Sequence, residues 1–262
     1  MLSKSQLAAK KILQKYCITK PNEIPIEDLI FAEGAYFEEK KINGSQGRII
    51  FKGNTAFISI NNSISHIGKK RFVIAHELGH YILHKNLAHF FNCNEIDFLE
   101  WHKTGSHESE ANEFAAEILM PYDLFNPITK VHPFKKDIIE HLSQKFGTSV
   151  TATALRYKDI GHTPIAIACS SNGFIKWSSR SNSFPLWQMK NKIRLSSESV
   201  ANDFFVNSKI PKEPQVITPS AWFEGIRRDT YGNSIYLYEQ CIHIKSQNEI
   251  ISLIWVCNDY TY

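Results

Sequence analysis

The segment RFVIAHELGHYILH, residues 71–84, is the most informative stretch of this 262-residue chain. Its nearly continuous apolar character predicts a buried helix over residues 65–85. Residues four apart lie on one face of a helix, so the imidazoles of His76 and His80 can reach the same point. Buried imidazoles and a buried carboxylate need a compensating partner, and a bound cation supplies one.

Zinc suits this pair, because it accepts imidazole nitrogen in a tetrahedral site. Glu77 lies about 100° around the helix from His76, within reach of a water beside the ion but not of the ion itself. The pentad therefore predicts a Zn²⁺ site with His76 and His80 as ligands and Glu77 as the catalytic base.

A third ligand is expected from a second helix, ESEANEFAAEILMP, which spans about 106–120 and is stopped by Pro121. Its buried face is defined by Ala111, Phe114, Ala115, Ile118 and Leu119. Glu108 lies at the edge of that face and is the favoured ligand, with Glu110 as the alternative. Glu113 is a weaker candidate, and it and Glu117 are expected to face solvent.

Other residues near the pentad have different expected roles. His84 lies about 12 Å along the helix axis from His76, too far to share an ion, and is interpreted as a helix-end residue. Leu83 and Asn86 stand where metzincins have Gly and His, which excludes that class. Asn112, four residues after Glu108, could brace a ligand histidine.

The two motifs together resemble the ImmA/IrrE family of metallopeptidases over roughly residues 20–125. The resemblance implies site-specific cleavage of a helix-turn-helix repressor, which would derepress stress or mobile-element genes. Gluzincin-type enzymes have a ligand Glu followed four residues later by an orienting Asp. This implies Glu108 as a ligand and puts Asn112 in the orienting position, where it keeps an acceptor but lacks the charge.

The expected fold class is α+β in three parts. Residues 1–125 would form a zincin-like metallopeptidase domain, with a small antiparallel sheet built from strands 35–38, 47–51 and 56–60. Residues 126–160 would form a helical, helix-turn-helix-like segment. Residues 161–262 would form a C-terminal α+β domain, compatible with a GAF-like sensor of a small-molecule signal.

The helical segment consists of 134–146, a turn at 147–149 and a second helix over 150–157. Only Arg156 and Lys158 would decorate the second helix, and the net charge of +4 is modest. Direct nucleic-acid binding is therefore not expected. The many aromatic residues of the C-terminal part are explained more simply by core packing than by a ligand pocket.

The cysteines and the distribution of apolar residues predict where in the cell the protein is located. The five cysteines form no CxxC pair, and the N-terminus lacks the apolar core of a signal peptide. No apolar run approaches the roughly 18 residues of a membrane span. We expect a cytoplasmic protein without membrane contact.

The resulting hypothesis is a cytoplasmic zinc endopeptidase. The alternative is a DNA-binding or toxin–antitoxin regulator in which zinc is structural. Structural sites use four protein ligands, and the sequence offers three strong ones, which favours catalysis. The donor that would stabilise the oxyanion stays open among Tyr81, His102, His107 and Tyr122.

Overall fold

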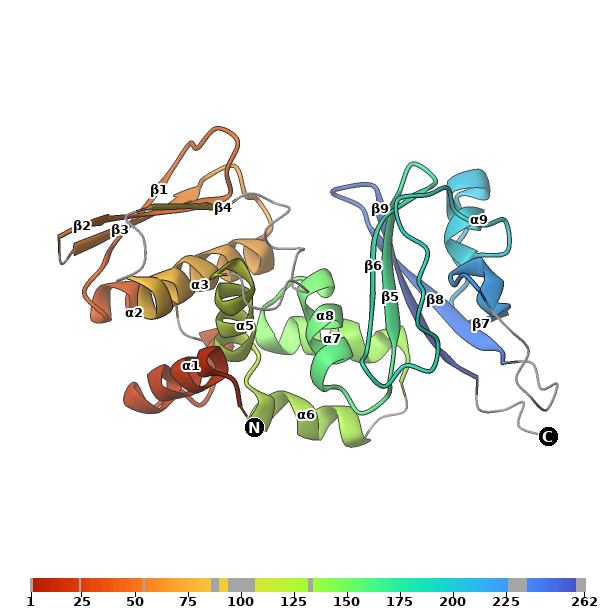
Figure 1. Cartoon of the computed structure of the whole chain (residues 1–262), viewed down its shortest axis with the longest axis horizontal. Helices are drawn as coiled ribbons and strands as arrows, with labels where there is room; N and C mark the ends of the chain where they lie inside the picture. Colours follow the sequence, from red (N-terminus) through yellow and green to blue (C-terminus); the bar gives the residue numbers. More distant parts are fainter. Residues whose placement is uncertain are drawn as a thin grey trace. The chain divides into compact units, whose positions relative to one another are not determined.

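The computed structural model describes residues 2–23, 25–53, 55–85, 90–93, 107–131, 134–225 and 235–257. The chain divides into two compact units, Met1–Phe125 with Leu142–Ala152, and Asn126–His141 with Thr153–Tyr262. Figure 1 shows the elements of each unit. The three-part division expected from the sequence stays a prediction.

The first unit opens with helices. Helix α1 (Lys4–Lys15) begins at a capping box, in which Ser3 accepts from the backbone of Gln6 and the Gln6 side chain accepts from Ser3 N. The short η1 (Pro21–Glu23) and α2 (Ile26–Ala32) follow. The long α3 (Ile67–His84) carries the pentad, as predicted.

The sheet of this unit contains β1 (Tyr36–Lys40), β2 (Gly47–Lys52), β3 (Thr55–Asn61) and β4 (Phe90–Cys93) in the order β1-β3-β2-β4. It is mixed, which corrects the expectation of a purely antiparallel sheet. Strand β2 is antiparallel to both neighbours, but β1 pairs parallel with β3. Because β3 and β4 occupy the two edges of β2, β1 joins the sheet on the far side of β3. The sheet packs against α3 (Figure 1).

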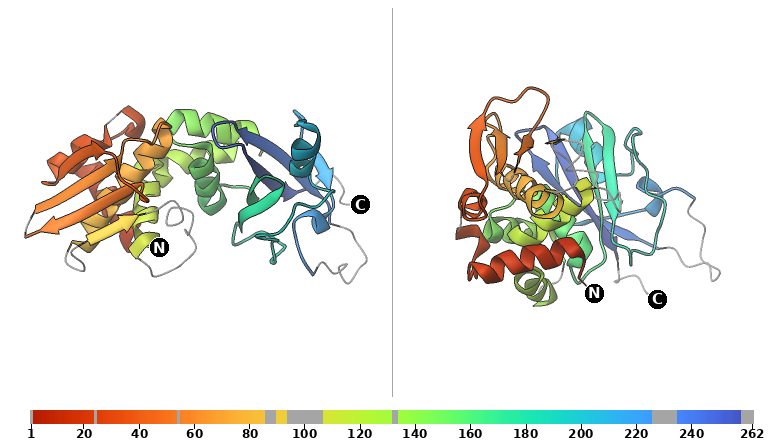
Figure 2. Two further views of the ribbon diagram at one scale, coloured as in Figure 1. Left: turned by 90° about the horizontal axis from the view of Figure 1, so that it is seen from above. Right: turned by 60° about the vertical axis from the view of Figure 1, so that its left-hand side comes forward.

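Helix α5 (His107–Leu119) packs closely against α3. Gly79 makes this possible, because a Cβ at Gly79 would lie 3.1 Å from Phe114 Cδ1 and 3.2 Å from the Ala111 backbone. Helix α1 covers another side of α5 (Figure 2). The two motif helices are therefore held at a short, well-defined separation.

Three further helices follow: α6 (Tyr122–Val131), α7 (Lys136–Phe146) and α8 (Val150–Ile160). The turn between α7 and α8 contains Gly147 at a φ of +60°, which favours glycine. The helix-turn-helix shape is confirmed. However, Arg156 and Lys158, which were expected to decorate α8, are both buried, so α8 presents no basic side chain to a nucleic acid.

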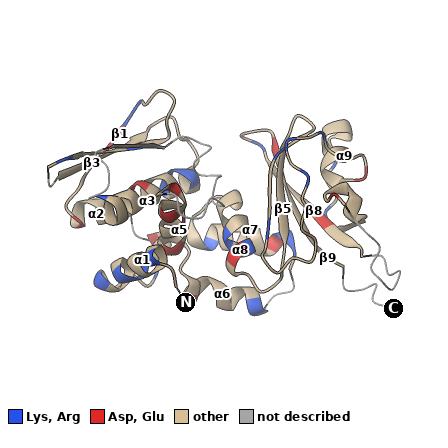
Figure 3. Ribbon diagram, in the orientation of Figure 1, with Lys and Arg blue, Asp and Glu red and all other residues tan. Residues whose placement is uncertain are grey.

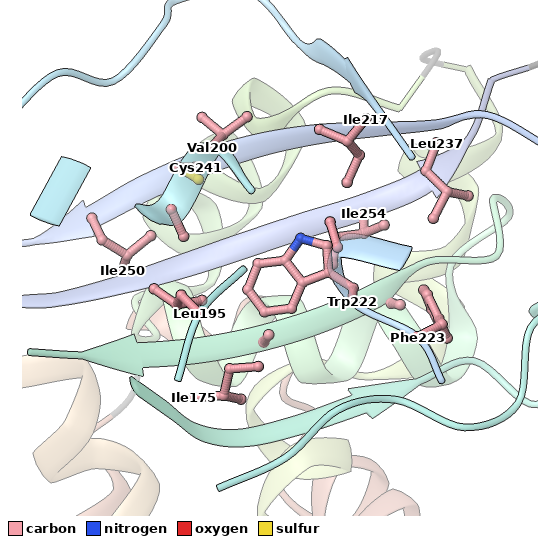
Figure 4. Packing of buried hydrophobic residues seen from close by; sticks show 14 of the residues in the cluster. Ile175, Leu195, Val200, Ile217, Trp222, Phe223, Leu237, Cys241, Ile250 and Ile254 are labelled. Atoms are coloured by element: carbon pink, nitrogen blue, oxygen red, sulfur yellow. The ribbon is translucent and has the colours of Figure 1, made fainter. Parts of the chain in front are cut away.

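The second unit is built on a sheet of β5 (Ala166–Ser171), β6 (Phe174–Arg180), β7 (Gln215–Ile217), β8 (Leu237–Ile244) and β9 (Glu249–Val256). Its order is β6-β5-β9-β8-β7, and every pairing is antiparallel. Helix α9 (Val200–Asn207) and η2 (Pro219–Ala221) complete it. Figure 4 shows Trp222 surrounded by the apolar side chains of the core, in line with the packing role expected for the aromatic residues.

None of the described helices combines the length and the apolar character that crossing a bilayer requires.

Candidate metal centre

Four side chains from three elements meet at one point of the first unit. His76 and His80 come from α3, Glu108 comes from the first turn of α5, and Cys93 ends β4. Their ligand atoms all lie within 4.8 Å of one another. Figure 3 shows acidic residues, in red, on α3 and α5 where these helices pack together.

The distances within the cluster are short. His76 Nε2 lies 3.0 Å from His80 Nε2 and 3.1 Å from Glu108 Oε2, and His80 Nε2 lies 3.4 Å from Glu108 Oε1. The structure therefore brings together the three residues that the sequence favoured as ligands. Both imidazoles are fully buried, whereas Glu108 is partly exposed.

Asn112 fixes the orientation of the His76 ring. Its Oδ1 lies 2.9 Å from His76 Nδ1, and an amide oxygen can only accept, so Nδ1 carries the hydrogen. In a neutral imidazole this leaves the lone pair on Nε2, which faces Glu108 and His80. Asn112 thus occupies the bracing position that its spacing from Glu108 predicted.

A second chain of hydrogen bonds fixes the ring of His80. His84 Nε2 lies 2.7 Å from Glu110 Oε2, and His84 Nδ1 lies 3.0 Å from His80 Nδ1. The carboxylate of Glu110 accepts, so a neutral His84 accepts in turn from the Nδ1–H of His80. The lone pair of His80 therefore also lies on Nε2, facing the cluster.

The structure gives Glu110 and His84 roles other than those expected from the sequence. Glu110, the alternative ligand, contacts His84 and does not belong to the four-residue cluster. His84 does not join the cluster either, but it is fully buried and orients His80, a role that its helix-end position did not suggest. The regular spacing of His80 and His84 was the available signal for this contact.

The pKa values favour the ligand forms of these groups. Burial lowers the pKa of His80 to about 4, against an opposing effect of its hydrogen bond with Glu108. Burial also lowers the pKa of His84. Burial alone would raise the pKa of Glu108, but its interactions with His76 and His80 outweigh this and hold that pKa well below its ordinary range. At neutral pH the His80 imidazole is therefore neutral and the Glu108 carboxyl group is ionised.

Glu77 lies fully buried on α3 beside β2. The strand approaches its carboxyl group so closely that a Cβ on Gly47 would lie 2.9 Å from Glu77 Cδ. Glycine is thus required at position 47 for Glu77 to keep this place. Nothing in the sequence pattern singled out Gly47, because the contact joins elements separated by a loop and a whole strand.

Cys93 was also missed. Residues 90–93 form β4 and place the buried Sγ of Cys93 3.5 Å from His80 Nε2. Only the pairing of β4 with β2 creates this proximity.

The donor set fits zinc. Three atoms with lone pairs, at 3.0 to 3.4 Å from one another, repel each other unless a cation lies between them. Tetrahedral zinc with bonds of about 2.0–2.1 Å to nitrogen and oxygen separates neighbouring ligand atoms by about 3.3 Å. His76, His80 and Glu108 would therefore hold such an ion with little movement.

The candidate donors to the oxyanion do not belong to the four-residue cluster of possible metal ligands. The hydroxyl of Tyr81 donates to the Glu33 carbonyl, the ring of His107 packs beside that of His84, and Tyr122 is exposed. His102 lies outside the described residues.

Glu113 and Glu117 were expected to face solvent. Glu113 is partly buried and accepts from Ser3. Glu117 is buried and accepts from the backbone N–H of Tyr122, which corrects that expectation. This acidic side chain caps the start of α6, where unpaired N–H groups favour a carboxylate.

Comparisons with known proteins agree with this geometry. Residues 34–158 match the family described as the IrrE N-terminal-like domain, Peptidase_M78. The metallopeptidase ImmA of Bacillus subtilis (strain 168) is 33% identical over 109 residues, which cover 40% of this chain. The match spans 56% of the length of that relative.

A solved structure of a Mycobacterium tuberculosis transcriptional regulator matches with a TM-score of 0.62, over 97% of this chain and 77% of that one. Its sequence identity is 13%, so this likeness shows a shared fold alone. With the pentad on α3 and the acidic motif on α5 both inside the matched family region, residues 34–158 form a domain of the ImmA/IrrE family.

Proposed function

We propose that this protein is a zinc-dependent endopeptidase of the cytoplasm that cleaves a helix-turn-helix transcriptional repressor. The observation that carries the proposal is the convergence of His76, His80 and Glu108, with both histidine lone pairs directed at one point. The neighbouring Glu77 carboxylate supplies the base that hydrolysis requires.

When bound, zinc supplies a Lewis acid that polarises a peptide carbonyl and makes water a stronger acid. Glu77 takes a proton from the attacking water as the oxygen bonds to the carbonyl carbon. As the C–N bond breaks, Glu77 gives that proton to the leaving amine. Gly47 leaves room for the Glu77 carboxylate. Asn112 fixes the orientation of the His76 ring, and the His84–Glu110 pair fixes that of His80.

The repressor substrate is proposed from family membership, since members of this family are metallopeptidases connected with regulation. The five cysteines are free, which suits a reducing compartment. The proposal includes a small-molecule signal that binds to the second unit.

A second candidate function is a zinc-containing regulator without peptidase activity. Cys93 favours it, because a fourth protein donor beside the three expected ones is typical of closed, structural zinc sites. A Glu77→Gln variant separates the two functions: an enzyme would lose its action with zinc retained, whereas a regulator would keep it.

The decisive experiment incubates the zinc-loaded full-length chain with helix-turn-helix repressors encoded beside its gene and reads intact masses. We expect two fragments whose masses sum to the repressor plus one water. Glu77→Gln should keep its zinc and give no fragments, and the matched surface variant Glu39→Gln should cleave like wild type. Cleavage by Glu77→Gln at the wild-type rate would refute the mechanism, and no cleavage of any repressor would refute the substrate.

A further inference from the structure

We propose that the thiolate of Cys93 is the fourth ligand of the metal in the resting protein, and that it must leave before water can enter. This inference rests on the proposed function and concerns the regulation of the same site. It makes the peptidase latent until Cys93 is displaced.

The first support is distance. Tetrahedral zinc, with a Zn–S bond of about 2.3 Å and a Zn–N bond of about 2.0 Å, separates sulfur from nitrogen by about 3.5 Å. Cys93 Sγ lies 3.5 Å from His80 Nε2, and all four donor atoms lie within 4.8 Å of one another. Sulfur thus already stands at the tetrahedral distance from one of the two ligand histidines.

The second support is strand register. Cys93 pairs with Gly47 across β2 and β4, and paired residues project from the same face of a sheet. The missing side chain of Gly47 is the space that borders the Glu77 carboxylate. Cys93 therefore reaches the metal from the side on which Glu77 would hold the attacking water, and the thiolate and the water compete for one position.

The third support is charge and burial. Cys93 is fully buried, as are both histidines. A buried thiolate is costly unless a cation lies beside it, and zinc deprotonates a coordinating thiol. With Glu108 and Cys93 both negative, a divalent ion leaves the buried cluster neutral.

The position of Cys93 also makes displacement feasible. Among the described strands β4 is an edge strand of four residues, and Cys93 is its last residue, held by pairing with β2 and by its carbonyl, which accepts from Gln46 N and Ser45 Oγ. Moving the last residue of a short edge strand disrupts few ladder hydrogen bonds. Substrate binding next to β4 is the event that we expect to withdraw the thiolate.

X-ray absorption at the zinc edge tests the inference on the wild-type, full-length protein, without any variant. We expect one sulfur neighbour at about 2.3 Å together with nitrogen and oxygen neighbours. A first shell of nitrogen and oxygen alone would overturn the inference while leaving the metal site intact. A protein that binds no zinc at all would overturn the proposed function as well.

Substitution of Co²⁺ for zinc gives an independent readout. Wild type and the control Cys169→Ser, a buried cysteine of β5, should both show thiolate-to-cobalt charge-transfer absorption. Cys93→Ser should lose that absorption, bind one Co²⁺ at least about ten-fold more weakly, and cleave substrate faster than wild type. Retained absorption in Cys93→Ser, or slower cleavage with the metal bound, would contradict a displaceable thiolate.

Discussion

Single hydrogen bonds determine which nitrogen of each histidine faces the cluster. Asn112 braces His76, and the pair of His84 and Glu110 braces His80. A carboxylate in place of the Asn112 amide would make the bracing bond charge-assisted and His76 a more basic ligand.

Asn112 therefore controls metal affinity. We expect Asn112→Asp to bind zinc up to about ten-fold more tightly than wild type, and Asn112→Leu to bind about 10–100-fold more weakly. Competition with a chromophoric chelator measures both. Equal affinities for the two variants would show that Asn112 does not act through His76.

Gly47 controls the position of Glu77. A methyl group at position 47 would collide with the carboxyl group, so Gly47→Ala should keep zinc but lose about 100-fold in peptidase rate. Zinc content and melting temperature serve as controls for folding. A Gly47→Ala enzyme with the wild-type rate would mean that Glu77 is not the base in this position.

At the scale of elements, the distance between α3 and α5 sets the distance between their ligands. Gly79 permits the close approach, and the Ala111 backbone opposite cannot move as a flexible side chain would. Replacing Gly79 by alanine would stabilise the helix by about 1 kcal/mol through helix propensity. The added methyl group would overpack the contact with α5, which costs about 1–3 kcal/mol of stability.

We expect Gly79→Ala to lower the free energy of unfolding by about 1 kcal/mol and to weaken zinc binding, because both ligand histidines share its helix. Denaturant unfolding of the metal-free protein and chelator competition test the two effects separately. A more stable variant would show that α5 yields to the added methyl group.

In the second unit a buried carboxylate joins α9 to β8. Glu239 Oε2 accepts from Val200 N at 2.9 Å and Trp222 Nε1 at 3.0 Å, and Oε1 accepts from Ala201 N at 3.2 Å and Ser252 Oγ at 2.9 Å. Glu239→Gln would turn an amide NH₂ toward two of these donors. It should cost about 1–3 kcal/mol of stability, whereas the exposed Glu213→Gln should cost almost nothing.

The same residue predicts a pH dependence. Burial raises the pKa of Glu239 above 4.5, against opposing hydrogen bonds, so the folded state holds its proton more tightly than the unfolded state. Its contribution is complete below pH 4.5 and is lost as the pH rises through the folded-state pKa. Cys241 donates to Glu239 with its own pKa raised by burial, so it stays a neutral thiol through this window.

The stability gap between wild type and Glu239→Gln should therefore be widest in acid and narrow as the pH rises. Urea unfolding across this range measures the gap. A gap that widens with pH would show that the hydrogen-bond donors around Glu239 keep its carboxylate ionised in the folded protein.

At the scale of the whole molecule, the sequence predicted what local patterns encode. The apolar periodicity around His76 and His80 predicted α3, and Pro121 marked the end of α5. It did not predict α6, which has Pro127 inside it, or the three-residue β7.

The rest of the site depends on contacts that only the folded chain creates. Cys93 joins the cluster because four residues without an alternating pattern pair with β2. The contact between Gly47 and Glu77, and that between Glu110 and His84, likewise connect separate elements. Contacts between separate elements of this kind carry no signal in a single sequence.

Among the described residues, the candidate metal centre lies in the first of the two compact units, whereas the proposed response to a signal is assigned to the second. The proposed activity therefore depends on metal binding in the first unit.

Zinc stoichiometry in wild type, Glu108→Gln and Glu110→Gln, measured by elemental analysis after dialysis against equal zinc, tests that dependence most directly. We expect one zinc per chain in wild type and Glu110→Gln, and almost none in Glu108→Gln. Full zinc occupancy in Glu108→Gln together with its loss in Glu110→Gln would contradict it.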